Sequence, residues 1–153
     1  MSRIYMSENR SPRLLLVEDE PGDARLMRLA MQKNGYAVDL QDASDGHEAL
    51  CFLQRRGEQF AGAPRPDLIL LDLKMPGQGG LEFLEAIKQD ENLRAIPVVV
   101  ITTSALEADV FNAYRLGAAG YVLKPVDINE FVAAIHSLGQ YWFKLVRLPE
   151  NQE

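Results

Sequence analysis

Asp72 directly follows four aliphatic residues, 68–71. Such a run is typical of a strand covered on both faces, and the acid at its end should emerge at the carboxyl edge of a parallel sheet, where ligands bind. Asp72 could instead cap the next helix, but Pro76 and the glycines after it separate it from any helix start. We therefore treat Asp72 as a candidate reacting group.

An acidic pair, Glu18 and Asp19, ends another aliphatic run, 14–17. If the two runs are neighbouring strands, three carboxylates converge at one edge and repel one another unless a cation joins them. An all-oxygen site of this kind suits Mg²⁺. The alternative is that Glu18 and Asp19 only favour the positive end of the first helix, which leaves Asp72 unexplained.

A hydroxyl and an ammonium follow two further apolar runs. Thr102 comes after residues 98–101 and Lys124 after residues 119–123. Ser104 is expected to cap the next helix, whereas Thr102 has no evident structural duty. Lys124 suits contact with an oxyanion. Together with a metal and a carboxylate nucleophile, these groups predict a phosphoryl-transfer site.

The segments that position these residues alternate between strand and helix. Strands are expected at 14–17, 37–42, 68–71, 98–101 and 119–123, and helices at 21–34, 46–56, 80–90, 105–116 and 128–143. Residues 57–66 are expected to form a surface loop. This alternation predicts an α/β fold, a flavodoxin-like (βα)5 doubly wound parallel sheet with strand order 2-1-3-4-5.

Composition limits the function classes. The chain has 153 residues and a net charge of −6, which argues against a general nucleic-acid-binding surface. No apolar run approaches the length of a membrane span, and the single Cys51 fits a reducing compartment. We expect a cytoplasmic protein with no nucleic-acid or membrane partner.

Four motifs, each ending an expected strand, resemble those of the receiver domains of two-component response regulators. The resemblance covers roughly residues 13–137. The matching segments are 14–19 (LLLVED), 70–77 (LLDLKMPG), 100–102 (VIT) and 120–125 (GYVLKP). We therefore expect a receiver domain at 13–143, a flexible N-terminal segment at 1–12 and a C-terminal extension at 144–153.

The resemblance implies a role for each residue at the site. Asp72 would accept a phosphoryl group from a sensor histidine kinase, and the protein would catalyse only its own phosphorylation and dephosphorylation. Thr102 and Lys124 would contact the phosphoryl group, and Tyr121 would be a rotameric switch. The Lys124–Pro125 bond would be cis. Magnesium would be bound by Glu18, Asp19, Asp72 and the backbone carbonyl of Lys74.

The C-terminal region continues an apolar stripe beyond what a receiver requires. Its aromatic tail either folds back on the chain or forms a partner surface, and the sequence leaves both possibilities open. This ending is similar to that of single-domain regulators paired with bacterial phytochromes. We expect a homodimer through the helix at 105–116, the last strand, the last helix and the extension, with contacts from Phe111, Tyr114, Trp142 and Leu145.

Two other classes of protein use similar parts. A Mg-dependent aspartyl-phosphate phosphohydrolase also has a nucleophilic aspartate at a strand end, but usually has a second aspartate two residues later, where this chain has Lys74. A nucleotide or flavin module would require a glycine-rich phosphate loop, and neither of the common patterns is present. The receiver is favoured over both.

Overall fold

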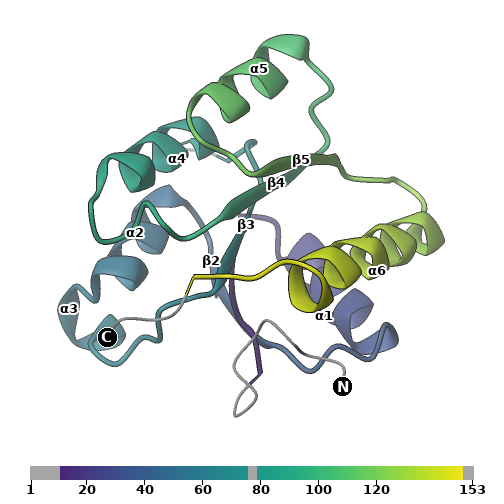
Figure 1. Cartoon of the computed structure of the whole chain (residues 1–153), viewed down its shortest axis with the longest axis horizontal. Coiled ribbons are helices and arrows are strands. Elements are labelled where there is room, and N and C mark those ends of the chain that lie inside the picture. The colour runs from purple at the N-terminus through teal and green to yellow at the C-terminus, as the bar shows by residue number, and fades with distance from the viewer. Residues whose placement is uncertain (1–10, 76–78, 150–153) are drawn as a thin grey trace.

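The computed structural model describes residues 11–75 and 79–149 (Figure 1). The strands in this part of the chain are β1 (Arg13–Val17), β2 (Asp39–Ala43), β3 (Leu68–Leu71), β4 (Val98–Thr102) and β5 (Gly120–Leu123). The helices are α1 (Pro21–Lys33), α2 (Gly46–Gln54), α3 (Gly57–Phe60), α4 (Gly80–Gln89), α5 (Glu107–Arg115) and α6 (Ile128–Lys144). The expected N-terminal segment, 1–12, lies outside the described residues apart from Ser11 and Pro12.

The strands form one parallel sheet in the order β2-β1-β3-β4-β5, which confirms the predicted flavodoxin-like fold. Helices α1 and α6 cover one face, and α2, α4 and α5 cover the other (Figure 1). Because β3 is covered on both faces, all four of its residues are fully buried. The strand therefore holds the residue that follows it, Asp72, at a fixed place on the carboxyl edge.

Local sequence signals account for most of the helix boundaries. Pro21 occupies the first position of α1, and the carboxylates of Asp45 and Asp127 cap α2 and α6 by accepting hydrogen bonds from backbone amides. Two expectations were wrong. The loop at 57–66 contains the short helix α3, whose Phe60 packs against Phe52. Helix α5 begins at Glu107 without a side-chain cap, so Ser104 does not cap it.

Gly80 determines how closely α4 approaches the carboxyl edge. A Cβ atom at this position would lie 2.6 Å from Leu73 Cα and 2.8 Å from the carbonyl oxygen of Asp72. Only glycine permits this contact, because both neighbours are backbone atoms that cannot move aside. The start of α4 is thus packed against the segment that follows β3.

The C-terminal region folds back on the chain. Phe143 and Leu148 are buried, and Trp142 packs against the core formed by α1 and α6. The ring of Tyr36 occupies the space beside Gly139, and its hydroxyl donates to the carbonyl oxygen of His136. This part of the expected partner surface is therefore largely covered within the same molecule.

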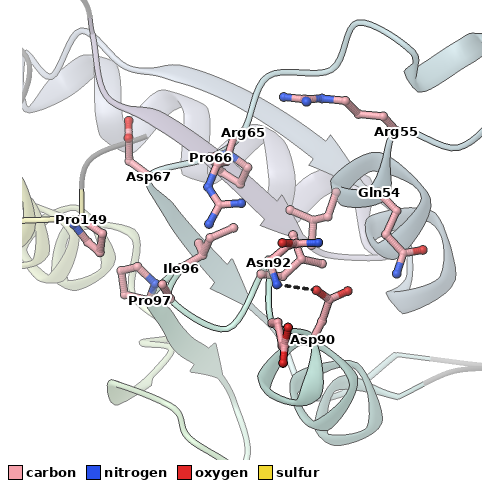
Figure 2. Close-up of a pocket in the computed structure, with 14 residues that line it drawn as sticks. Gln54, Arg55, Arg65, Pro66, Asp67, Asp90, Asn92, Ile96, Pro97 and Pro149 are labelled. Atoms are coloured by element: carbon pink, nitrogen blue, oxygen red, sulfur yellow. Dashed lines mark hydrogen bonds between the residues drawn. The ribbon is translucent and has the colours of Figure 1, made fainter. Parts of the chain in front are cut away.

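A cavity of about 760 Å³ lies at the amino edge of the sheet, opposite Asp72 (Figure 2). Pro149 forms one wall beside Asp67 and Pro97, so the segment after α6 crosses this edge. The lining includes two arginines, Arg55 and Arg65, and the three acidic residues Asp67, Asp90 and Glu91. This mixture of charges does not select an ion of either sign.

None of the helices in the described ranges is both long and apolar enough to cross a membrane.

Candidate functional site

The ammonium group of Lys124 is the centre of the candidate site. It follows β5, and its Nζ lies 2.9 Å from Glu18 Oε1, 3.1 Å from Asp23 Oδ2 and 3.2 Å from Asp72 Oδ2. The side chains of Lys124, Glu18 and Asp72 are all at least nine-tenths buried. Three strand ends and the first turn of α1 thus meet around one cation, as the strand order requires.

Asp72 is held through both carboxylate oxygens. Oδ2 contacts Lys124, and Oδ1 accepts a hydrogen bond of 3.0 Å from the backbone amide of Lys74. The two contacts hold the two oxygens of this carboxylate apart, one toward the cation and one toward the backbone. The position at the end of buried β3 fixes its direction.

Burial raises the pKa of Glu18 to about 7, although the hydrogen bond and charge of Lys124 act in the opposite direction. Burial by itself would lower the pKa of Lys124, but the hydrogen bond and charge of Glu18, with those of Asp72 and Asp23, raise it above its ordinary value. Lys124 therefore remains an ammonium throughout the physiological range, whereas Glu18 titrates near neutrality.

Asp23 was not predicted as a site residue. Its position in the first turn of α1 is typical of an acid that interacts with the helix dipole. Because that role explains the residue, its contact with Lys124 was not expected. Its spacing of five residues from Glu18, across the turn from strand to helix, is the sequence signal that could have identified it. The carboxylate of Asp23 is 41% exposed, far more than that of Glu18 or Asp72.

The oxygen atoms of Glu18 and Asp72 suit a hard divalent cation, since both converge on one positive charge. Asp19 is exposed and does not join them here. Within residues 11–75 and 79–149, no three His, Cys, Asp or Glu side chains lie close enough together to hold a metal ion. Lys124 occupies the space between the two buried carboxylates and offsets part of their charge.

Thr102 is fully buried at the end of β4, and its Oγ1 accepts a hydrogen bond of 3.4 Å from the backbone amide of Ser104. The Thr102 carbonyl oxygen accepts from the backbone amide of Lys124 at 2.7 Å, which ties the two strand ends together. Tyr121 is half-buried, and its hydroxyl donates to the Ser104 carbonyl oxygen at 2.8 Å. The predicted hydroxyl, lysine and tyrosine therefore belong to one connected region.

The expected cis bond between Lys124 and Pro125 is wrong for this structure, because the described residues contain no cis peptide bond. The trans form is the ordinary preference of an X–Pro bond.

The residues expected at a dimer surface divide into two groups. Phe111, Tyr114 and Leu145 are 67%, 51% and 62% exposed, which suits a contact surface. Trp142, in contrast, packs partly against the core and makes an edge contact with Tyr141.

The chain matches the model of the response regulator receiver domain over residues 14–136. The response regulator Rcp1 from Synechocystis sp. is 38% identical over 146 residues, which cover 94% of this chain and 99% of the relative. The matched region, residues 14–136, contains all four motifs identified in the sequence.

Solved structures agree with this similarity. The phosphorylated cyanobacterial phytochrome response regulator RcpA is 36% identical with a TM-score of 0.87, covering 92% of this chain and all of that one. RPA3017, a response regulator in red light signaling of R. palustris, is 32% identical with a TM-score of 0.86, covering 92% and 99%. The Mn²⁺-bound form of Rcp1 is 37% identical with a TM-score of 0.84, covering 91% and 99%.

Motifs, fold and relatives therefore agree, and the resemblance drawn from the sequence is confirmed: the chain belongs to the response regulator receiver domain family.

Proposed function

We propose that the protein accepts a phosphoryl group on Asp72 from a phosphohistidine of a sensor histidine kinase. The observation that supports this most directly is the buried Asp72 carboxylate at the end of β3, held 3.2 Å from Lys124 Nζ. The unit that performs the reaction is the receiver domain, residues 13–143.

The transfer requires one bond to form and one to break. An oxygen of Asp72 attacks phosphorus, the bond from phosphorus to the donor imidazole nitrogen breaks, and the electron pair of that bond stays on the imidazole. Lys124 then pairs with a phosphoryl oxygen, for which it releases one of its three carboxylates. Thr102 donates a hydrogen bond through its hydroxyl to another phosphoryl oxygen. Positioning and charge neutralisation account for most of the catalysis in such reactions.

Magnesium is the cation that we propose for this site, with Glu18, Asp19, Asp72 and the Lys74 carbonyl as its ligands. When bound, it would neutralise charge on the phosphoryl oxygens. The oxygen-only donor set favours a hard cation, and the related Rcp1 has been crystallised with Mn²⁺. Glu18 binds a cation only when deprotonated, so its raised pKa makes metal affinity increase with pH.

The kinase partner that we propose is a bacterial phytochrome. This rests on the names of relatives, since RcpA is a phytochrome response regulator and RPA3017 acts in red light signaling in its organism. A cytoplasmic location would follow from such a partner. We propose no nucleic-acid or membrane partner, in keeping with the net charge of −6.

We also propose a homodimer through α5, β5, α6 and the residues that follow α6. Exposed Phe111, Tyr114 and Leu145 would supply its apolar contacts. Trp142 would support the surface from beneath rather than contact the partner. Light scattering at tens of micromolar should show a dimer, and Phe111→Lys should give a monomer. A monomeric wild-type protein at that concentration would exclude this assembly.

Autophosphorylation rather than turnover of external substrates distinguishes a receiver from a Mg-dependent phosphohydrolase. With a small phosphate ester in excess, we expect labelling to stop at or below one phosphoryl group per chain. Continued release of phosphate at a steady rate would support the hydrolase instead.

The central test is labelling by acetyl phosphate with Mg²⁺, followed by mass spectrometry. Wild type should gain one phosphoryl group and Asp72→Asn none. Asp67→Asn is a matched control. Asp67 precedes the same strand and, like Asp72, is only 8% exposed, but it lies at the opposite edge of the sheet. Labelling of Asp72→Asn at the wild-type rate would refute the proposal.

A further inference from the structure

Ser104, on the loop between β4 and α5, is the centre of four hydrogen bonds. Its amide donates to Thr102 Oγ1, and its carbonyl oxygen accepts from the Tyr121 hydroxyl. Its hydroxyl donates to Asp109 Oδ2 at 2.5 Å and accepts from the Leu106 amide at 3.4 Å. Ser104 is only 3% exposed, so water does not compete strongly for these contacts.

Asp109 supplies the strongest of these contacts. It lies in the first turn of α5, a helix that begins without a side-chain cap, and its carboxylate points back to the loop. A hydroxyl that donates to a carboxylate forms one of the shorter and stronger types of hydrogen bond. Asp109 therefore fixes the loop to α5, where a cap would ordinarily do so.

The position of the loop determines what Thr102 can do. Because Thr102 Oγ1 accepts from the Ser104 amide, the lone proton of the threonine hydroxyl is left for another acceptor. Thr102 ends the strand next to the one that holds Asp72, so that acceptor can be a group transferred to Asp72. If the Ser104 amide were displaced, the Thr102 hydroxyl would be free to rotate and would point toward the phosphoryl group less often.

We propose that Asp109 is a positioning residue for phosphoryl transfer, holding Ser104 so that the Thr102 hydroxyl is aimed at the phosphoryl group on Asp72. This inference rests on the proposed function of Asp72. Asp109 touches no reacting atom and acts only through Ser104 and Thr102.

Tyr121 gives a second measure of the same loop. Its hydroxyl binds the Ser104 carbonyl oxygen, and burial raises its pKa, with the nearby charge of Asp109 adding to the increase. If Asp109 holds the loop, removing its carboxylate should shift the nuclear magnetic resonance signals of the Tyr121 ring.

The first experiment compares rates of labelling by acetyl phosphate with Mg²⁺. Asp109→Ala should be about three- to tenfold slower than wild type, less than the full worth of a hydrogen bond to a charged group, because Asp109 acts only through Ser104 and Thr102. Asp109→Asn should lie between them, because its amide oxygen can still accept. Glu107→Ala is the matched control, since it removes an exposed acid from the same helix turn, and it should label at the wild-type rate.

The second experiment repeats Asp109→Ala in the Thr102→Ala background. No further slowing is expected there, because the effect of Asp109 passes through Thr102. Equal slowing in both backgrounds, or wild-type labelling of Asp109→Ala, would overturn the inference while Asp72→Asn still failed to label. Labelling of Asp72→Asn would instead refute the proposed function.

Discussion

Two lysines, one at each edge of the sheet, are held in opposite ways: the side chain of Lys124 is buried and Lys88 is half-buried. At the carboxyl edge Lys124 is surrounded by carboxylates, and their charges raise its pKa. At the amino edge the Nζ of Lys88 donates to the carbonyl oxygens of Arg94 and Ile96 at 2.9 and 2.8 Å, and burial lowers its pKa. The first arrangement concentrates charge that a ligand can rearrange, whereas the second only joins two segments of backbone.

The same contrast extends along both edges. At the amino edge, Asp67 accepts from the Arg13 amide and Tyr36 donates to the His136 carbonyl, so these side chains contact neutral backbone groups rather than other charges. The carboxyl edge holds like charges together and is ready to change partners. Stability and reactivity are thus assigned to different ends of the same strands.

The largest expected effect comes from Lys124→Met. It leaves the buried carboxylates of Glu18 and Asp72 without their cation, and we expect a loss of about 3 kcal/mol in the free energy of unfolding without metal. Added Mg²⁺ should recover part of the loss, because it binds the folded state. Urea unfolding in EDTA measures the loss of stability, and urea unfolding in Mg²⁺ measures the recovery. Unchanged stability in EDTA would show that the two edges do not differ as described.

Gly139→Ala tests the packing of the amino edge. The new Cβ would lie 2.2 Å from an atom of the Tyr36 ring, and we expect a loss of about 2 kcal/mol despite the better helix propensity of alanine. Gly62→Ala, with nothing within 4 Å of its Cβ, serves as the control and should be nearly neutral. Thermal melting measures the stability, and labelling of Asp72 should be unaffected. If Gly139→Ala were more stable than wild type, the close packing of Tyr36 against Gly139 would be wrong.

Glu18→Gln tests the charge stored at the carboxyl edge. Because the pKa of Glu18 is raised to about 7, the folded state binds more protons there than the unfolded chain between pH 4.5 and about 7. The stabilising contribution is therefore present below pH 4.5 and is lost as pH rises through 7.

We expect Glu18→Gln to remove this decline and to gain about 1 to 2 kcal/mol at pH 8 without metal. Denaturant unfolding across pH in EDTA checks it, with exposed Glu85→Gln as the control. A decline that persists in Glu18→Gln would assign the titration to another group.

Lys88→Met should have the smallest effect. The methionine keeps the apolar contact of the side chain but leaves two carbonyl oxygens without their donor, at a cost of about 1 kcal/mol. Unlike Lys124→Met, it should not respond to Mg²⁺. If Mg²⁺ restored both variants equally, the comparison between the two lysines would fail.

The fold could be predicted from the sequence because aliphatic runs, caps and turn glycines all agreed. Gly35 and Gly117, for example, adopt the positive φ angles, 74° and 106°, that helix ends favour. The ends of apolar runs also located Asp72, Thr102 and Lys124. The spacing of Asp23 from Glu18 offered a signal that was missed, whereas the contacts of Ser104 and Asp109 could not be predicted, since they depend on how far a side chain reaches across a turn. The path of the chain after α6 could not be predicted either, because it depends on packing against the sheet edge, which the spacing of apolar residues does not determine.

Trp142 is the single tryptophan of the sequence. It lies near the end of α6, half-buried and in edge contact with Tyr141 at 5.1 Å between ring centroids. Since α6 starts just after Lys124 at the carboxyl edge and Trp142 lies in its last turn, the indole is far along the helix from the site. The intrinsic emission of this protein therefore reports on the C-terminal packing, and a change in it upon adding Mg²⁺ would mean that the two ends of the sheet communicate.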